Sequence, residues 1–369
     1  MPSAASDTRT VMTLDAGGTS FRFSARRGSE RVTEIVTLPS QGDDLARCLG
    51  ALGEGFTRIR SACPEPPVAI SFAFPGPADY PAGIIGDLPN LPAFRGGVAL
   101  GPMLEAKFGL PVFINNDGDL FAYGEAIAGF LPYVNGLLAR AGSPRRFHNL
   151  FGVTIGTGFG GGLVRCGELF RGDNSMAAEV WLFRHKLQRQ TNVDEGASIR
   201  AVRRTYAELI GIPFVDAPTP REIEAIAYGK LPGHRAAATE AYRRLGEVAG
   251  DALAHALTLV DGLAVIGGGL SAAGPLFLPA LVAELNSTYT TPDGRPLRRL
   301  CQQAFNLEDA DQLAAFVRGA TREIVVPGTD RRISYDQLAR TGVGISRLGT
   351  SEAIGIGAYA FALQQLDRT

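Results

Sequence analysis

The stretch TLDAGGTSFRFS, residues 13–24, decides the fold prediction. β-prone residues at positions 11–14 and 21–25 flank the segment DAGGT, so we predict a β-hairpin with DAGGT at its turn. A tight turn alone would explain the glycines, but it would not need Asp15 and Thr19 at these offsets. Backbone N–H groups that converge in a glycine turn form an anion site. Beside such a turn, an aspartate can hold hydrated Mg²⁺ and a threonine hydroxyl can reach a phosphate oxygen.

The size and composition of the chain are typical of a soluble globular protein. Its 369 residues are enough for two domains, and it is 45% hydrophobic and 20% charged, with a net charge of −1. Because positive charge is not in excess, we expect neither nucleic acid nor a membrane as a partner. The cysteines form no CxxC pair and the N-terminus lacks the apolar run of a signal peptide, so we expect reduced thiols in a cytoplasmic protein.

Helix-like and strand-like segments alternate along the first part of the chain. Apolar residues at helical spacing predict helices at residues 45–61, 100–108 and 120–129. Short apolar runs predict strands at residues 68–74 and 111–114, the first of them buried on both faces. Such alternation is typical of an α/β fold.

The second part of the chain repeats the opening pattern. The stretch NLFGVTIGTGFGGGLV, residues 149–164, again predicts a strand, a glycine turn and a strand, which indicates two similar halves with a cleft between them. Residues 262–283 carry no charge, but GGG and two prolines divide them into a strand, a loop and a helix, so we expect no membrane span. A last helix is predicted at residues 351–366. Residues 285–349 are rich in charge and turns and indicate an elaborated surface region.

Two further glycine turns have the composition of anion sites. GTGFGGG contains Thr157 and Gly158, and the run from Gly267 to Gly269 follows a predicted buried strand. Taken singly, each is also compatible with a plain tight turn. No Walker A motif is present, and the G-x-G-x-x-G of residues 156–161 precedes β-prone residues where a dinucleotide turn would open a helix.

The stretch FINNDGDLFAYGE, residues 113–125, places Asp117 after an apolar strand and before a helix. Open α/β sheets bind their ligands at this end of their strands. One interpretation is a helix cap, in which Asp117 or Asp119 accepts backbone N–H bonds. The other is catalytic: Asp117 takes the proton of a substrate hydroxyl as a general base, while Asn116 orients that substrate.

Together and in this order, the motifs resemble those of the ROK sugar kinases, in the actin/hexokinase/Hsp70 ATPase superfamily. LDAGGT resembles the phosphate-1 loop, GTGFGGGLV the phosphate-2 loop, NNDGDLFAYGE the catalytic-aspartate motif and VIGGGLS the adenosine loop. PGPADYPAGIIGDLPNLPAF, RGDNSMAAE and VDEGAS resemble the sugar-side segments. The resemblance implies a two-lobed, actin-like (ribonuclease H-like) α/β fold with a nucleotide and sugar cleft between the lobes. We expect a small lobe of residues 1–117 and 352–369 and a large lobe of residues 118–351.

The resemblance also implies a role for each motif residue. Asp117 would be the catalytic base that activates the sugar's 6-hydroxyl, and Asp15 would hold Mg²⁺ through water near the γ-phosphate of ATP. The other nucleotide contacts would come from the glycine turns, through Gly17, Gly18, Thr19, Thr157, Gly158, Gly267, Gly268 and Gly269. The remaining sugar hydroxyls would bind Asn90, Asn116, Glu179 and Glu195.

The chain departs from the family in one segment. Where family members carry a GH pair and a cysteine cluster that bind structural zinc, this chain has EVWLFRHKLQRQTNVDE, with Leu182 in the histidine position. We expect no zinc, because one histidine without partners cannot hold zinc in a closed site. We expect His185 at the surface or in a loop. Packing of Trp181 and Phe183 is expected to hold the loop that presents Glu195.

The leading interpretation is an ATP-dependent hexose kinase of the glucokinase or hexokinase type. An N-acetylhexosamine kinase is the alternative, because the motifs do not separate 2-hydroxyl from 2-acetamido sugars. A sugar-sensing regulator would need a helix-turn-helix module, which we do not expect, since few residues precede the first predicted strand. A non-catalytic sugar-binding protein would not need Asp15 and Asp117. Because ROK proteins are commonly dimers, we expect a homodimer.

Overall fold

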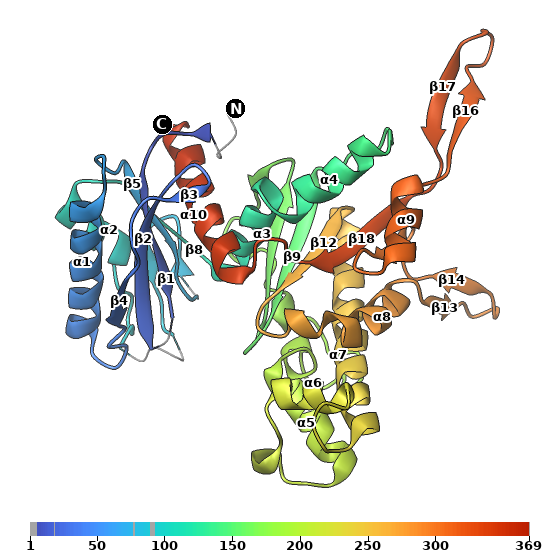
Figure 1. Cartoon of the computed structure of the whole chain (residues 1–369), viewed down its shortest axis with the longest axis horizontal. Coiled ribbons are helices and arrows are strands. Elements are labelled where there is room, and N and C mark those ends of the chain that lie inside the picture. Colours follow the sequence, from blue (N-terminus) through green and yellow to red (C-terminus); the bar gives the residue numbers. More distant parts are fainter. Residues whose placement is uncertain (1–5, 18, 77, 89–92, 369) are drawn as a thin grey trace. The chain divides into compact units, whose positions relative to one another are not determined.

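The computed structural model describes residues 6–17, 19–76, 78–88 and 93–368 (Figure 1). The chain forms two compact α/β units. The first comprises Met1–Gly129, Gly162–Ala178 and Leu348–Thr369, and the second comprises Phe130–Gly161 and Glu179–Arg347. This division differs from the expected boundaries at residues 117 and 351, because helix α3 (Asp117–Ile127) and residues 162–178 pack with the first unit.

The first unit contains one mixed sheet in the order β3-β2-β1-β5-β8, with β4 also paired to β2. β1 (Val11–Ala16) and β2 (Ser20–Arg27) form the predicted antiparallel hairpin. β1, β5 (Ala69–Ala73) and β8 (Val112–Asn115) run parallel, so their carboxyl ends meet at one edge of the sheet. The remaining strands are β3 (Glu30–Arg31), β4 (Val36–Pro39), β6 (Ala78–Asp79) and β7 (Ile84–Ile85).

Helices cover both faces of this sheet. Successive side chains of β1 point to opposite faces, and apolar residues on each face are buried by a helix. Met12 and Leu14 belong to the core closed by α1 (Leu45–Ala62) and α2 (Leu100–Phe108). Val11 lies in a separate cluster with α10 (Thr350–Leu366). All three helices match the segments predicted at residues 45–61, 100–108 and 351–366 to within one residue.

Helices α3 and α10 pack backbone to backbone. A Cβ atom added to Gly124 of α3 would lie 2.0 Å from a carbonyl oxygen of α10, and one added to Gly357 of α10 would lie 2.0 Å from a carbonyl oxygen of α3. Only glycine permits so close an approach. The contact therefore holds α3, whose first residue is Asp117, firmly against the C-terminal helix.

A second sheet has the order β11-β10-β9-β12-β18-β15. Its strands β9, β12, β18 and β15 belong to the second unit, whereas β11 (Glu168–Leu169) and residues 162–165 of β10 fall within the range of the first unit. β9, β12, β18 and β15 run parallel, and β12 is buried along its whole length. The strands are β9 (Asn149–Ile155), β10 (Phe159–Arg165), β12 (Leu263–Gly267), β15 (Gln303–Asn306) and β18 (Arg340–Ile345). The strand–glycine turn–strand device predicted for the second half is confirmed by β9 and β10.

The second unit also contains several helices. They are α4 (Phe130–Arg140), α5 (Ile199–Ile210), α6 (Pro220–Ala227), α7 (Arg235–Val260), α8 (Gly274–Leu285) and α9 (Ala310–Arg318), with 3-10 turns η2 (Val180–Leu182), η3 (Val193–Glu195), η4 (Phe214–Asp216) and η5 (Ser271–Ala273). The uncharged stretch of residues 262–283 forms β12, η5 and part of α8, as predicted. In the part of the chain that the structure describes, no helix is long and apolar enough to cross a membrane.

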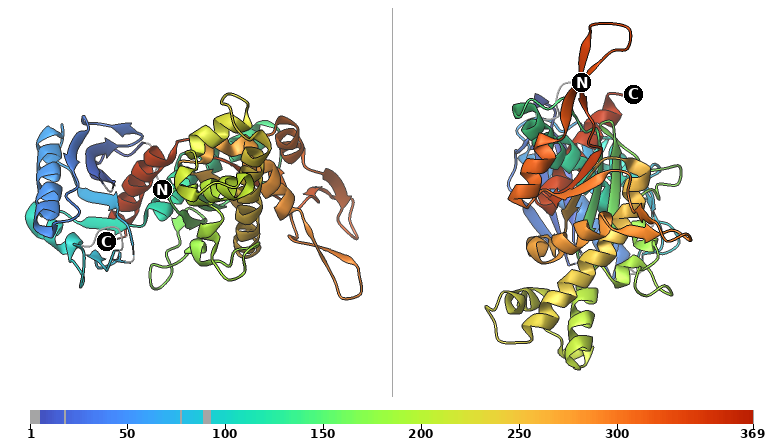
Figure 2. Two further views of the ribbon diagram at one scale, coloured as in Figure 1. Left: turned by 90° about the horizontal axis from the view of Figure 1, so that it is seen from below. Right: turned by 90° about the vertical axis from the view of Figure 1, so that its right-hand side faces the viewer.

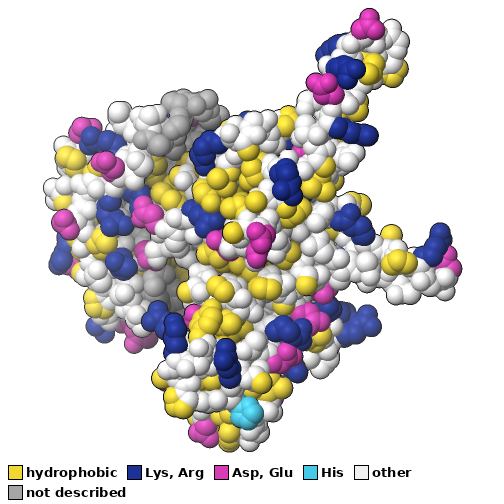
Figure 3. Space-filling view, turned by 45° about the vertical axis from the view of Figure 1, so that its right-hand side comes forward, with side chains coloured by type: hydrophobic (Ala, Val, Ile, Leu, Met, Phe, Trp, Pro, Cys, Tyr) yellow, Lys and Arg dark blue, Asp and Glu magenta, His cyan; other side chains and the backbone are white. Residues whose placement is uncertain are grey.

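Residues 285–349 are more than a surface elaboration. Two hairpins, β13–β14 (Thr288–Thr290 and Pro296–Arg298) and β16–β17 (Thr321–Val325 and Arg332–Asp336), stand away from the rest of the second unit (Figures 1 and 2). Figure 3 shows charged side chains near the ends of both hairpins. β15 and α9 lie between the two hairpins in sequence, and β18 follows them. The expected elaborated surface region therefore also contributes strands to the second sheet, since β15 and β18 belong to that sheet itself. The sequence does not indicate this, because both strands are short and pair with segments far along the chain.

Candidate functional site

The opening turn of the first unit presents Asp15 at the end of β1. Its geometry requires glycine at position 17, where a Cβ would lie 2.9 Å from the Ser20 carbonyl oxygen, to which the Gly17 N–H donates at 3.0 Å. Thr19 is exposed beyond this turn, while Gly18 lies outside the described residues. Asp15 has no hydrogen bond or ion pair with any other described residue, so its carboxylate is available to a ligand.

Asn116 and Asp117 lie at the same edge of the first sheet as Asp15, because β1 and β8 both run parallel to the β5 that separates them. The helix-cap interpretation is correct for this position but applies to Asn116. Its Oδ1 accepts a 2.8 Å hydrogen bond from the Gly118 N–H and caps α3. Asp117 is the first residue of the helix, and its Oδ1 accepts from the same N–H at 2.8 Å.

The carboxylate of Asp117 combines access with an unfavourable environment for charge. The side chain is exposed, yet desolvation by the surrounding protein raises its pKa, and the backbone N–H bonds that it accepts only partly oppose this. Water at the side chain does not remove the low-dielectric protein behind it, so the charged form of Asp117 stays disfavoured. A carboxylate with a raised pKa is a stronger base, as proton abstraction from a hydroxyl requires.

Two of the predicted sugar-side segments come together in the first unit. A cavity of about 510 Å³ is lined on one side by the segment of the β6–β7 turn and on the other by Asp173, Asn174, Ser175 and Met176. The first segment carries the predicted sugar contact Asn90 farther along, but Asn90 lies outside the described residues. The remaining sequence-predicted sugar contacts, Glu179 and Glu195, belong to the second unit.

The two glycine turns of the second unit lie next to each other. They follow the parallel strands β9 and β12, and the Leu270 N–H donates to the Ile155 carbonyl at 3.0 Å. Gly268 has a φ of +88°, and a Cβ there would lie 2.4 Å from the same carbonyl oxygen, so glycine is required. Thr157 is exposed at the tip of its turn, and nothing lies within 4 Å of a Cβ built on Gly269. The structure thus places both predicted nucleotide turns at one sheet edge.

Glu179 and Glu195 are both half-buried but differently held. Glu179 accepts a hydrogen bond from the indole Nε1 of Trp181. Glu195 ends η3 and forms ion pairs with Arg204 at 2.6 Å and Arg200 at 3.0 Å, and these guanidinium groups, Arg204 foremost, hold its pKa below the usual range. Glu195 is therefore an ionised hydrogen-bond acceptor at neutral pH. It borders an open cavity of about 690 Å³ that is also lined by Leu182, Arg184, residues 188–192 and Arg204.

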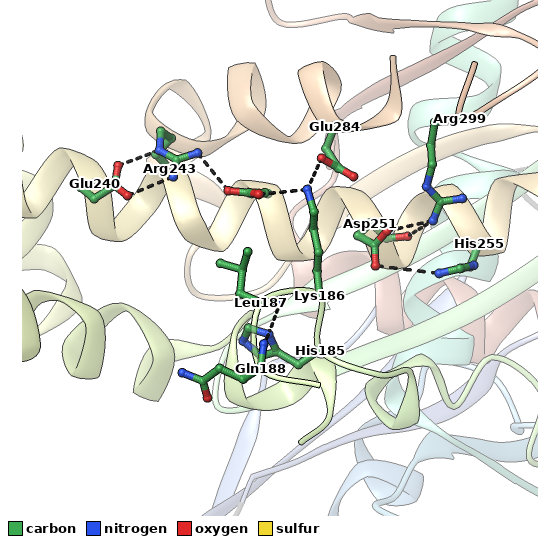
Figure 4. A network of polar contacts seen from close by, with 11 residues as sticks. His185, Lys186, Leu187, Gln188, Glu240, Arg243, Asp251, His255, Glu284 and Arg299 are labelled. Carbon is green, nitrogen blue, oxygen red and sulfur yellow. Dashed lines mark hydrogen bonds and ion pairs between the residues drawn. The ribbon is translucent and has the colours of Figure 1, made fainter. Parts of the chain in front are cut away.

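The loop that precedes Glu195 is organised around His185, which lies in a loop, as expected, but is buried there and not at the surface. His185 is only 4% exposed, and its Nδ1 accepts hydrogen bonds from the backbone N–H groups of Leu187 and Gln188, both at 3.0 Å (Figure 4). Nδ1 is therefore unprotonated and the proton sits on Nε2. Burial, more than the nearby charges, lowers the pKa of His185, so the ring is neutral. No group of three or more potential ligands for a metal occurs among the described residues.

Lys186 attaches the same loop to two helices. Its Nζ donates to Glu247 of α7 at 2.9 Å and to Glu284 of α8 at 2.5 Å (Figure 4). Partial burial disfavours its charge, but these two pairs outweigh that effect and raise the pKa of Lys186. Trp181 is 38% exposed and its indole donates to Glu179, while Phe183 packs against the ring of His255. Sequence reasoning missed Lys186 because its acidic partners lie far along the chain.

Known proteins resemble this chain in sequence and in fold. A model of the ROK family matches residues 11–310. The crystal structure of a glucokinase from Parabacteroides distasonis is similar over 99% of both chains, with 54% sequence identity and a TM-score of 0.90. A ROK family glucokinase from Streptomyces griseus, solved in complex with glucose and AMPPNP, shares the fold at 20% identity, over 96% of this chain and 99% of that one, with a TM-score of 0.61. These likenesses confirm the predicted two-lobed fold.

A curated relative with a different substrate is also similar. An N-acetyl-D-glucosamine kinase from Vibrio cholerae is 32% identical over 169 residues, which are 45% of this chain and 50% of the relative. The chain therefore spans half the length of that relative.

Proposed function

The chain belongs to the ROK family, and on that premise we propose that it is an ATP-dependent glucokinase that phosphorylates the 6-hydroxyl of glucose. The observation that carries this proposal is Asp117, an exposed carboxylate with a raised pKa at the carboxyl end of β8. The P. distasonis glucokinase, 54% identical over nearly the whole chain, supports glucose as the acceptor.

Asp117 would act as the general base. It accepts the proton of the 6-hydroxyl while that oxygen attacks the γ-phosphorus, the bond from phosphorus to the β-phosphate oxygen breaks, and ADP leaves. Asn116 would orient the sugar through its Nδ2 amide, because its Oδ1 is already engaged by the Gly118 N–H. Glu179 and Glu195 would accept hydrogen bonds from the remaining hydroxyls, and the amide of Asn90 would donate to or accept from one of them.

The glycine turns would hold ATP. Thr157 and Gly158 would contact the β- and γ-phosphates through backbone N–H groups and the threonine hydroxyl, as would the turn that carries Thr19. The neighbouring Gly267–269 turn leaves open backbone for adenosine. Mg²⁺ bound with ATP would neutralise phosphate charge, and Asp15 suits it because one free carboxylate beside phosphates is a common magnesium ligand.

An N-acetyl-D-glucosamine kinase is the second candidate, supported by the V. cholerae relative. The two candidates differ in whether the pocket admits a 2-acetamido group. We would measure ADP release with Mg-ATP against glucose, mannose, fructose, allose, N-acetylglucosamine and N-acetylmannosamine, and locate the phosphate on the product by ³¹P–¹H NMR. Turnover fastest on glucose, with phosphate on the 6-oxygen, is the expected result. Turnover confined to N-acetylglucosamine would replace the proposal by the second candidate.

The Asp117→Asn variant tests the base directly. General bases contribute about 10²–10⁴-fold to rate, so kcat should fall by that factor while the glucose Kd changes little. A variant with wild-type kcat would remove Asp117 from the mechanism.

Three accompanying proposals concern the state of the protein. We propose that it holds no structural zinc, that it works in the cytoplasm and that it is a homodimer. The homodimer is supported by the two protruding hairpins, β13–β14 and β16–β17, because isolated two-stranded hairpins are marginally stable. These hairpins expose Tyr289, Leu297, Ile333 and Tyr335, which a second copy of the chain would cover. Elemental analysis with about one zinc per chain, recovery of the protein with cell envelopes, or a monomeric mass by light scattering would each contradict one of them.

A further inference from the structure

The predicted phosphate-binding turn of the second unit, residues 156–159, is hydrogen-bonded to residues 194–200, the segment that carries Glu195. Three hydrogen bonds join them. The Phe159 N–H donates to Asp194 Oδ1 at 2.7 Å, the Ile199 N–H donates to the Gly156 carbonyl at 2.8 Å, and Arg200 Nη1 donates to the Thr157 carbonyl at 3.1 Å. The Asp194 carboxylate lies so close that a Cβ on Gly158 would be 2.9 Å from its Oδ1. The turn and the segment are therefore held together by both backbone and side-chain contacts.

The guanidinium of Arg200 is shared between the two predicted ligand contacts. While Nη1 holds the Thr157 carbonyl, Nη2 donates to Asp194 at 2.5 Å and to Glu195 at 3.0 Å. The guanidinium is planar and its nitrogens keep a fixed separation. A displacement of the Glu195 carboxylate is therefore passed through this plane to the backbone at the tip of the phosphate turn.

Glu195 meets its sugar ligand with the same carboxylate. Its two oxygens are divided between Arg200, on Oε1, and Arg204, on Oε2. A sugar hydroxyl that donates to Glu195 must share these oxygens with the guanidinium groups. The hydrogen bond from the sugar to Glu195 and the hydrogen bond to the Thr157 carbonyl are consequently linked through the side chain of Arg200.

We propose that Arg200 is a positioning residue that couples sugar binding at Glu195 to ATP phosphate binding at the Thr157 turn. This inference rests on the proposed function, because it takes Glu195 as a sugar contact and Thr157 as a phosphate contact. In this proposal Arg200 acts through Glu195 and Thr157 and makes no ligand contact of its own. When the sugar binds Glu195, Arg200 and Asp194 hold the Thr157 turn in the conformation that binds the phosphates. Without a sugar acceptor, the turn is not held in this way and the enzyme binds ATP less tightly.

Thermodynamic linkage makes the coupling measurable from either side, since sugar must improve nucleotide affinity by the same factor by which nucleotide improves sugar affinity. We would measure the Kd of Mg-AMPPNP by calorimetry with and without saturating glucose. Couplings of this kind typically amount to about 5–150-fold, so glucose should tighten AMPPNP binding at least about fivefold in the wild type.

Two variants and a matched control isolate Arg200. Arg200→Ala and Arg200→Lys should both reduce the glucose effect to less than about twofold, because an ammonium cannot hold Thr157 and two carboxylates in one plane. Arg244→Ala is the control: its side chain is 39% exposed, against 38% for Arg200, and it pairs with Glu240 at 2.8 Å away from both ligand turns. It should keep the wild-type ratio.

The outcomes separate this inference from the proposed function. A glucose effect preserved in a folded Arg200→Lys protein, or absent from a wild type that phosphorylates glucose, overturns the coupling role and leaves the kinase intact. A wild type that does not phosphorylate any sugar of the panel rejects the proposed function instead. If Arg200→Ala fails to fold, as judged by circular dichroism, Arg200→Lys and Asp194→Asn carry the test.

Discussion

Replacing Gly196 by alanine should disturb the loop that stands where relatives are expected to bind zinc. Gly196 follows Glu195 and has φ −116° and ψ −14°, a conformation that alanine adopts without strain. Any effect must therefore come from the added Cβ. That atom would lie 2.2 Å from Nε2 of His185 and 2.9 Å from a methyl group of Val248.

The magnitude follows from these distances. Ordinary contact begins at 3.4 Å, so the imidazole would have to retreat by about 1.2 Å in a closely packed interior. Such a shift takes Nδ1 out of reach of the Leu187 and Gln188 N–H groups, which it now accepts at 3.0 Å. At about 0.5–1.5 kcal/mol for each hydrogen bond, the free energy of unfolding should fall by about 1–3 kcal/mol.

Urea denaturation followed by tryptophan fluorescence is the suitable assay, because Trp181 is the chain's only tryptophan and lies close to this loop in sequence. Gly136→Ala is the matched control in the same unit. Gly136 lies inside α4, where a Cβ would meet only the mobile end of Arg140 at 3.4 Å. That substitution should stabilise by about 0.5–1 kcal/mol, since glycine weakens a helix interior.

The two variants should thus move in opposite directions. The Gly196→Ala protein should also show a raised KM for the sugar, because Glu195 is its neighbour. Equal or greater stability of Gly196→Ala than of Gly136→Ala would refute the buried His185 as the organiser of the loop.

Three further predictions concern other contacts. Because catalysis needs ionised Asp117 and its pKa is raised, kcat should fall on the acid side with a midpoint above that of an ordinary aspartate, about 3.9; a midpoint at or below that value in a pH–rate profile would contradict the assignment. Lys186→Met should destabilise by about 1–3 kcal/mol, because it leaves Glu284 without its cation. Since the pKa of Lys186 is raised, its contribution should be complete below about pH 10.4 and lost as the pH rises through the folded-state value, so urea midpoints of wild type and variant should converge only in strong alkali. Gly357→Ala should cost about 1–3 kcal/mol by forcing α10 from α3, and an unchanged melting temperature would show that the helices are not in backbone contact.

Local patterns were sufficient for much of the fold. The hairpin around DAGGT, helix α2 and the buried strand β5 were all predicted, because their signals are turn glycines, apolar spacing and short apolar runs within a few residues. The strands that residues 285–349 contribute to the second sheet were not predicted, because β15 and β18 are short and find their partners in a parallel sheet. Parallel pairing joins segments far apart in sequence, and neither strand carries its partner's position in its own residues.

The sequence by itself determined the chemistry offered at each turn: Asp15, Asp117, Thr157 and the glycines are recognisable from their neighbours alone. Only the tertiary structure decided how the second unit supports its turn and its sugar-side loop. Arg200 reaches Thr157 across 43 residues, and Lys186 reaches Glu284 across 98. Charged side chains form such contacts only after folding has brought distant backbone together. Their pairing therefore depends on how the helices and strands pack, and no local sequence pattern predicts it.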